Sequence, residues 1–416
     1  MVISYTFKNF KTFKEENTFS FLGGRKKELE EHLMSFDEHH RVLPLKVIYG
    51  SNASGKTNII KSLFVLKRIV LETKLKEAGE QNYLMLCSNF SSLEDYEAPV
   101  TFHLVFTMEN DIYDYFLSIQ NNYNDRKTIV LKEVLKENDA LIFERNGNNV
   151  KFSTKDDVVK KHYPQFKDSH FKSQIMQMIK VNMDENSVFT GWYNFIDAEL
   201  CFKLLYYFKS KLIVIYDLED YKLQLPENVK EGIFSNKLID ALLHELETGE
   251  KEFYVQVDKS GKSSERVVYK IDENCKIEAL PSSTESKGTI KMIDTLDLFL
   301  YALGQGATLV IDELDASIHH EIIYNIIQSF GDPSINKKGG QLIFTTHNPV
   351  YMNKELLRRD EIVFVEKDND SSIISTLEES NLRNDEVYLK NYLAGKYTIL
   401  PKFDIEHLLH VENKED

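Results

Sequence analysis

The stretch VIYGSNASGKTNII, from Val47 to Ile60, leads from an apolar run through a glycine-rich turn into a segment with helical spacing. It fits the pattern G-x-x-x-x-G-K-[ST], which marks a phosphate-binding loop when it follows a strand and precedes a helix. The glycines let backbone N–H groups turn inward, the helix N-terminus adds positive potential, and the lysine reaches the outer phosphates. The pattern predicts a nucleotide site made of Gly50, Ser51, Asn52, Ala53, Ser54, Gly55, Lys56, Thr57 and Asn58, with Lys56 catalytic and Thr57 a Mg²⁺ ligand.

A second motif, TLVIDELDASIH from Thr308 to His319, is an apolar run that ends in two adjacent carboxylates. At the end of a strand, Asp312 is suited to hold Mg²⁺, and Glu313 is suited to accept a proton from water that attacks the terminal phosphate. Apolar runs that end in solvated acids are common, so the pair alone leaves a purely structural role open. Beside a phosphate-binding loop, the pair predicts hydrolysis in addition to binding.

A third apolar run, LIFTTHNP, ends at His347. A histidine at the end of a strand can contact the terminal phosphate and take part in catalysis. A single histidine is as often a structural residue, so its position alone leaves both interpretations open.

The composition is that of a globular protein, with 416 residues of which 42% are hydrophobic and 28% charged. No apolar run approaches the roughly 18 residues of a membrane span, so we expect a cytoplasmic protein without a membrane partner. Cys87, Cys201 and Cys275 lack the spacing of a disulfide framework or a zinc site. The net charge of −15 disfavours extensive nucleic-acid binding but leaves a local basic patch open.

The order of strand and helix patterns predicts an α/β protein with a parallel-sheet core. VTFHLVFT and DYFLSIQ indicate an antiparallel sheet, and DAELCFKLLYYFKSKL and NKLIDALLHELE indicate helices. Beyond them, strands and helices alternate. We therefore expect an N-terminal half with the phosphate loop and an antiparallel β lobe (1–150), an inserted helical lobe (151–250) and a C-terminal half (251–416).

These motifs together resemble the ABC-type ATPase heads, in the SMC-like and RecF-like branch. In that branch a long insertion separates Walker A from Walker B, as Lys56 and Asp312 are separated here, and a switch histidine follows, as His347 does. The resemblance implies ATP and Mg²⁺ as ligands. It also implies a signature turn before Walker B, and TESKGTIKMIDTLDLFL occupies that place with Ser286, Gly288 and Thr289, although it departs from the transporter form LSGGQ.

A narrower resemblance is to bacterial AAA-family ABC-like ATPases of phage-defence operons, of the AbiL and PARIS types. It is carried by FKNFKTFKEENTFSF, IYGSNASGKTNIIKSL, ESKGT, VIDELDASIH, TTHNP and NYLAGKYTILP. The resemblance implies a homodimer or higher oligomer that sandwiches ATP between heads. It also implies a separate effector, often a TOPRIM-type nuclease, and a nucleic acid or phage protein as the trigger.

The chain departs from the family pattern at several positions. His319 stands where transporters have the D-loop aspartate, with Ser317 as the residue that could act there instead. Thr398 replaces the expected glycine of the closing motif, and Gln81 is only a weak candidate for the Q-loop glutamine. The D-loop substitution puts communication between subunits in doubt.

Three other functions remain to be weighed. A RecF-like repair ATPase would share every nucleotide residue but needs a basic face for DNA, which the net charge disfavours. An ATP-bound scaffold that does not hydrolyse is opposed by Glu313. A self-contained nuclease of the OLD type needs a TOPRIM domain, for which the roughly seventy residues after His347 are too few, and IVFVEKDNDSSI is typical of a hairpin.

Overall fold

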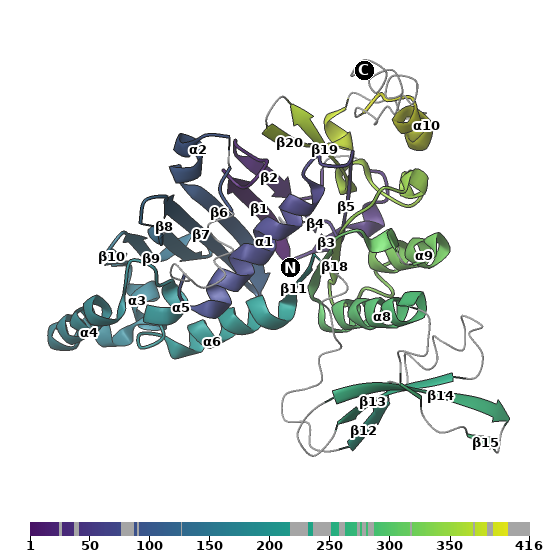
Figure 1. The fold of residues 1–416 in the computed structure, drawn as a ribbon. Coiled ribbons are helices and arrows are strands. Elements are labelled where there is room, and N and C mark those ends of the chain that lie inside the picture. Colours follow the sequence, from purple (N-terminus) through teal and green to yellow (C-terminus); the bar gives the residue numbers. More distant parts are fainter. Residues whose placement is uncertain are drawn as a thin grey trace, which may run out of the picture.

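The computed structural model shows a mixed α/β protein built around two large sheets (Figure 1), which confirms the predicted fold class. It describes residues 1–24, 27–36, 41–75, 87–89, 91–125, 127–216, 232–235, 251–257, 263–272, 275–276, 280–281, 287–316, 318–368, 371–380 and 386–397.

A six-stranded sheet forms the core that the phosphate-loop motif predicts. In spatial order its strands are β11 (Leu212–Ile215), β17 (Thr308–Ile311), β18 (Gln341–Thr345), β5 (Leu45–Gly50), β19 (Ile362–Asp368) and β20 (Ser371–Thr376). The first five are parallel, and β20 returns antiparallel to β19, which confirms the predicted hairpin. Strand β5 is buried along its whole length, as expected for an apolar run in a sheet that is covered on both faces.

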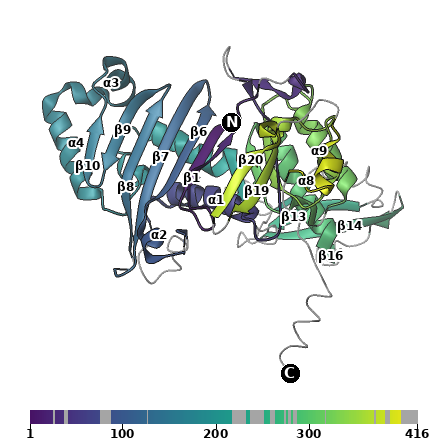
Figure 2. The same cartoon turned by 90° about the horizontal axis from the view of Figure 1, so that it is seen from above.

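Helices cover both faces of this sheet. Helices α8 (Lys287–Gln305) and α9 (His320–Gly331) pack on one face in a core that includes Leu309 and Phe344. Helix α1 (Lys56–Glu72) lies on the other face, where its apolar side shares a core with both sheets. Figure 2 shows α1 at the junction of the two sheets, so the helix that begins at the phosphate loop also joins the lobes.

The second sheet is antiparallel, as the alternating patterns predict. Its strands, in spatial order, are β10 (Asn149–Phe152), β9 (Ala140–Asn146), β8 (Lys127–Glu137), β7 (Asp111–Asn122), β6 (Val100–Met108), β1 (Val2–Lys8) and β2 (Asn17–Ser20). Side chains that alternate between buried and partly exposed along β6 match its period-two pattern.

The described part of the stretch for which the sequence predicts an inserted helical lobe contains the helices α3 (Asp156–His162), α4 (Ser169–Asn182), α5 (Phe189–Trp192) and α6 (Ala198–Tyr206). They pack on the antiparallel sheet, where Phe143 of β9 contacts Trp192 and Tyr193. The same stretch also supplies β11, which pairs with β17 in the parallel sheet. The predicted helix NKLIDALLHELE lies outside the described residues.

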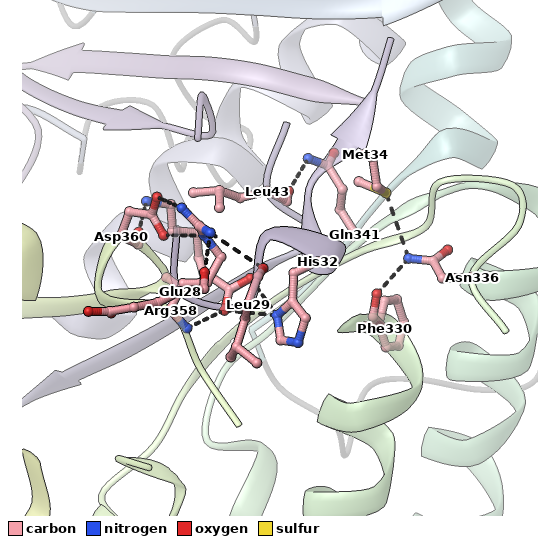
Figure 3. Close-up of polar contacts among 12 residues, drawn as sticks. Glu28, Leu29, His32, Met34, Leu43, Phe330, Asn336, Gln341, Arg358 and Asp360 are labelled. Carbon is pink, nitrogen blue, oxygen red and sulfur yellow. Dashed lines mark hydrogen bonds and ion pairs between the residues drawn. The ribbon is translucent and has the colours of Figure 1, made fainter. Parts of the chain in front are cut away.

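A buried glutamine links the two sheets. Gln341, the first residue of β18, accepts a hydrogen bond from Val2 N (2.6 Å) and donates to Val2 O (2.9 Å) and Leu43 O (3.1 Å). Thr308 of β17 donates to the same amide oxygen at 2.8 Å. One side chain therefore fixes β1 against two parallel strands, and Figure 3 shows its bond to Leu43.

The remaining described elements are smaller. A third sheet contains β12 (Gly232–Ser235), β13 (Lys251–Val257), β14 (Ser263–Asp272), β15 (Cys275–Lys276) and β16 (Leu280–Pro281), and β3 (Met34–Ser35) pairs with β4 (Arg41–Val42). Two short helices are α2 (Leu93–Glu97) and α10 (Tyr388–Leu393). Among the described helices, none is long and apolar enough to cross a membrane.

Candidate functional site

The phosphate loop, the paired carboxylates and His347 meet at the carboxyl edge of the parallel sheet. Strand β18 lies between β17 and β5, so the loop after β18 stands between the phosphate loop and the paired carboxylates. Thr346 N donates to Ile48 O at 3.1 Å, and Glu313 N donates to the Thr345 hydroxyl at 2.7 Å. The three motifs, which lie far apart in the sequence, are therefore joined through β18.

The phosphate loop has the backbone that its glycines allow. Gly55 is the N-cap of α1 with φ 115°, and Ala53 has φ 62°. A Cβ on Gly50 would lie 2.5 Å from Val365 O, so this position also has no room for a side chain. The loop residues Asn52 and Ala53 are exposed, whereas Ser54 is buried. The strand–loop–helix context that the motif requires is present.

Lys56 lies folded back over the loop. It is 6% exposed, and its Nζ donates to Gly50 O (2.8 Å) and Ser51 O (3.0 Å). Burial lowers the pKa of Lys56, while the carboxylates of Asp312, Glu313 and Asp315 oppose the shift. The lysine of the first motif is thus close enough to the acids of the second to feel their charge.

Two residues that the sequence did not point to support the loop from behind. Ser372 of β20 donates to Ser54 O at 2.6 Å, and Asn58 donates to the Thr12 hydroxyl at 3.0 Å. A Cβ on Gly55 would lie 2.8 Å from both the Ser372 and the Thr12 hydroxyl oxygens. These contacts come from the N-terminal segment and the β19–β20 hairpin, so no local pattern around the loop could have revealed them.

Thr345 contacts both acidic residues, the carboxylate of Asp312 and the backbone of Glu313. Its hydroxyl donates to Asp312 Oδ1 at 2.5 Å and accepts from the backbone N of Glu313 at 2.7 Å. Asp312 is 8% exposed, whereas Glu313 is exposed and has a left-handed backbone with φ 48°. A left-handed conformation is strained for a residue other than glycine, and Thr345 helps to hold it. In the sequence, the available signal for this role is the pair of threonines directly before His347.

Replacement of Thr345 by valine is expected to weaken both stability and turnover. Valine keeps the branched shape but leaves the buried Asp312 oxygen without its donor, which costs about 1–3 kcal/mol of unfolding free energy. ATP turnover should fall and need more Mg²⁺, since Asp312 loses its fixed orientation. Urea unfolding and turnover against Mg²⁺ concentration measure the two effects. Thr345→Ser, which keeps the hydroxyl, is the matched control, and equal Mg²⁺ dependence in the two variants would contradict this role.

His347 is exposed and lies two residues after the end of β18. The preceding Thr346 donates to Asp315 Oδ2 at 2.8 Å and accepts from Asn348 N at 2.9 Å, which fixes the backbone on either side of the histidine. His347 therefore stands at the open rim of the same edge as Glu313.

The remaining predicted residues are only partly described. Gly288 and Thr289 lie in the first turn of α8, the helix that leads to β17. Ser286, Gln81, Ser317 and Thr398 lie outside the described residues. His319 caps α9, accepting from Glu321 N at 3.4 Å.

Comparison with known proteins gives a family. A sequence model described as "AAA domain, putative AbiEii toxin, Type IV TA system" matches residues 45–353, more than half of the 416-residue chain. A search of curated proteins finds no significant match. Among solved structures, the chain is similar to an SmcHead bound to the C-winged helix domain of ScpA, with a TM-score of 0.42 and 12% identity over 90% of this chain and 97% of that one.

Proposed function

This chain belongs to the family of AAA domains described as putative AbiEii toxins of type IV toxin–antitoxin systems, and on that premise we propose an ATP-hydrolysing regulator of antiphage defence. The observation that carries the ATPase part is that Lys56 and the carboxylates of Asp312 and Glu313 share one edge of the sheet. The proposed role in regulating antiphage defence is supported by the toxin–antitoxin description of the family and by the sequence resemblance to phage-defence ATPases.

The donor set fits a Mg²⁺–nucleotide. Lys56 holds a buried ammonium group at the loop, and Ser54 Oγ is a buried oxygen with no partner among the described residues. Lys56 and the loop N–H groups would hold the phosphates, and Thr57 and Asp312 would hold Mg²⁺. When bound, ATP with Mg²⁺ supplies a phosphoryl group made electrophilic by the metal charge.

Glu313 is the proposed general base. Its side chain is exposed at the sheet edge, and its backbone is held by Thr345 and by the N–H of Ala316, which donates to Glu313 O at 3.0 Å. A carboxylate in this place can accept a proton from water during attack on the terminal phosphate. His347 at the same rim would contact the developing charge.

We further propose that the site is completed by a second copy of the chain. Asn52, Ala53, Glu313 and His347 are all exposed, so one side of the candidate site is open. Ser286, Gly288 and Thr289 of the other subunit would supply N–H and O–H donors there, because a helix N-terminus favours an anion. An arginine finger that arrives in trans accelerates phosphoryl transfer by roughly 10³-fold or more, and these donors would act on the same developing charge.

If ATP holds two copies of the chain together, the protein has a paired state and a separated state, and a partner can favour one of them. A signal that binds one state better shifts the population toward it. In the proposed function, a nucleic acid or phage protein is the signal, and a separate effector, such as a TOPRIM-type nuclease, responds to the state of the heads.

Mixing of two inactive variants tests completion in trans. Lys56→Ala removes the loop lysine and Ser286→Arg blocks the signature turn, so each homodimer should be inactive. A mixed dimer has one site with both defects and one site with neither, and ATPase activity should partly return on mixing.

The control is each variant mixed with itself at the same total concentration. Sizing chromatography with ATP reports whether mixed dimers form. Mixed dimers without recovered activity would contradict completion in trans and would favour a site built within one chain.

A further inference from the structure

A buried histidine joins two helices to the antiparallel sheet. His162, the last residue of α3, is 4% exposed. Its Nε2 lies 3.0 Å from Glu137 Oε2 at the end of β8, and its Nδ1 lies 3.0 Å from Asp197 Oδ2 at the start of α6. One side chain therefore connects α3, β8 and α6.

These two contacts require a charged ring. A neutral imidazole has one N–H donor, and its other nitrogen is an acceptor. Each nitrogen of His162 faces a carboxylate oxygen, which is also an acceptor while it is ionised. A neutral ring would leave two acceptors in contact in a buried place, which costs free energy. Only the protonated ring donates to both carboxylates at once.

The carboxylate of Glu137 has two further donors. Tyr113 of β7 donates to Oε1 at 2.6 Å, and Lys161 of α3 lies 2.7 Å from Oε2. Burial raises the pKa of Glu137, but the hydrogen bonds from His162, Lys161 and Tyr113 outweigh this effect and lower the pKa to about 2. Glu137 is therefore charged throughout the neutral range of pH, as a contact with a protonated ring requires.

The other titratable groups around the ring also leave room for a positive charge. Asp197 faces it from α6, and Asp111 of β7 lies 3.2 Å from the Lys161 ammonium. Burial raises the pKa of both Tyr193 and Cys201, so these two groups stay neutral. With the carboxylate of β8, three acids thus stand against one described ammonium, and a proton on the ring brings the charges closer to balance.

The direction of the pH dependence follows from these contacts. Burial lowers the pKa of His162, but the hydrogen bonds and charges of Asp197 and Glu137 outweigh this effect, and the pKa is raised. Such a group stabilises the fold fully below the pKa of the unfolded chain, about 6.5 for histidine, and the effect is lost as the pH rises through the folded-state pKa. We propose that the charged ring of His162 is a proton-dependent latch that holds α3 and α6 on the antiparallel sheet.

The latch acts on an element that leads to the parallel sheet. Helix α6 continues through the π-helical turn Tyr207–Lys211 into β11, which pairs with β17, and in Figure 1 it runs from the antiparallel sheet toward β11. Val158 of α3 and Leu200 and Leu204 of α6 are buried in the apolar core. Loss of the proton therefore loosens the two helices locally while the lobe stays folded. The latch goes beyond the proposed function and does not depend on it.

The pKa of His162 tests the latch directly. Titration of the full chain with ¹³C-labelled histidine gives one curve for each ring, and His162→Gln identifies the curve of His162. We expect a pKa at least about one pH unit above that of an unperturbed histidine, because an opposite charge at this range shifts a pKa by about 1–3. A pKa at or below the ordinary value would show a neutral ring beside a protonated carboxylate and would overturn the proposal.

Asp197→Asn separates the charge from the structure. The amide can donate to an unprotonated ring nitrogen, and asparagine can still cap α6, where Asp197 accepts from Leu200 N at 2.9 Å. The pKa of His162 should fall by at least about one pH unit in this variant. Asp168→Asn makes the same change at the exposed N-cap of α4 and should leave the pKa unchanged. Equal pKa values in Asp197→Asn and the wild type would contradict the assignment.

Hydrogen exchange measures the latch itself. Opening of α3 and α6, corrected for the intrinsic pH dependence of exchange, should increase at least about tenfold as the pH rises through the pKa of His162, because one pH unit between the closed and open states corresponds to tenfold. In Asp197→Asn it should be nearly independent of pH. Helix α9 on the parallel sheet is the internal control. Opening of α3 and α6 that does not change with pH in the wild type would overturn the latch.

Discussion

Lys56→Ala is expected to lower ATP affinity at least about a hundredfold, because it removes the single ammonium group held inside the phosphate loop. Hydrogen bonds to a charged partner contribute about 1.5–3 kcal/mol each, and backbone N–H groups cannot supply the missing charge. The ammonium group also donates to two carbonyls of its own loop, Gly50 O and Ser51 O. Isothermal titration with ATP and Mg²⁺ measures the affinity directly.

The control for this substitution is Lys180→Ala, which removes the same side chain from an exposed position on α4. Circular dichroism and thermal unfolding of both variants separate a lost ligand contact from a lost fold. A folded Lys56→Ala protein with unchanged ATP affinity would refute the assignment of the phosphate loop. In cells that carry the chain with its adjacent genes, the same substitution should abolish protection against phage, and retained protection would contradict the regulatory role.

Glu313→Gln is expected to lower ATP turnover by about 10²-fold or more while ATP remains bound. Glutamine keeps the shape of the side chain and can still hydrogen-bond, but it cannot accept a proton, and loss of a general base costs about 10²–10⁴ in rate. The backbone hydrogen bonds of Glu313 to Thr345 and Ala316 do not involve the carboxylate, so its position should be kept. Steady-state phosphate release and ATP titration on the same preparation measure the two quantities.

Glu199→Gln supplies the matched control, since this exposed glutamate lies in the first turn of α6, which packs on the antiparallel sheet. Its turnover should equal that of the wild type. Hydrolysis by Glu313→Gln at the wild-type rate would place the base elsewhere. The trapped ATP-bound state of Glu313→Gln should also favour paired heads, which connects this variant to the mixing experiment.

The sequence by itself determined much of the candidate nucleotide site at the carboxyl edge of the parallel sheet. The loop around Lys56 and the strand before Asp312 are local patterns, in which a glycine, a lysine and an apolar run fix the backbone within a few residues. The hairpin of β19 and β20 likewise follows from two apolar runs around a polar turn. Such features can be predicted because their geometry depends on neighbours in the chain.

Other features depend on strand order, which the sequence does not state. Thr345 acts on Asp312 and Glu313 only because β18 pairs with β17, and Ser372 and Thr12 reach the loop only because β20 and the N-terminal segment lie behind it. The role of β11 in the parallel sheet was hidden inside a largely helical stretch for the same reason.

The contact between His32 and Glu361 shows most clearly what only the tertiary structure decided. His32 and Glu361 are 329 residues apart, and Gly331 makes room for the ring from a third segment. In the sequence, His32, Glu361 and Gly331 show no pattern that connects them. The environment of the buried imidazole is set by residues that only the fold brings beside it. The sequence thus determined the phosphate loop through local backbone chemistry. Packing decided which side chains from distant parts of the chain interact electrostatically, form a hydrogen bond or line the same cavity, since those interactions depend on distance in space.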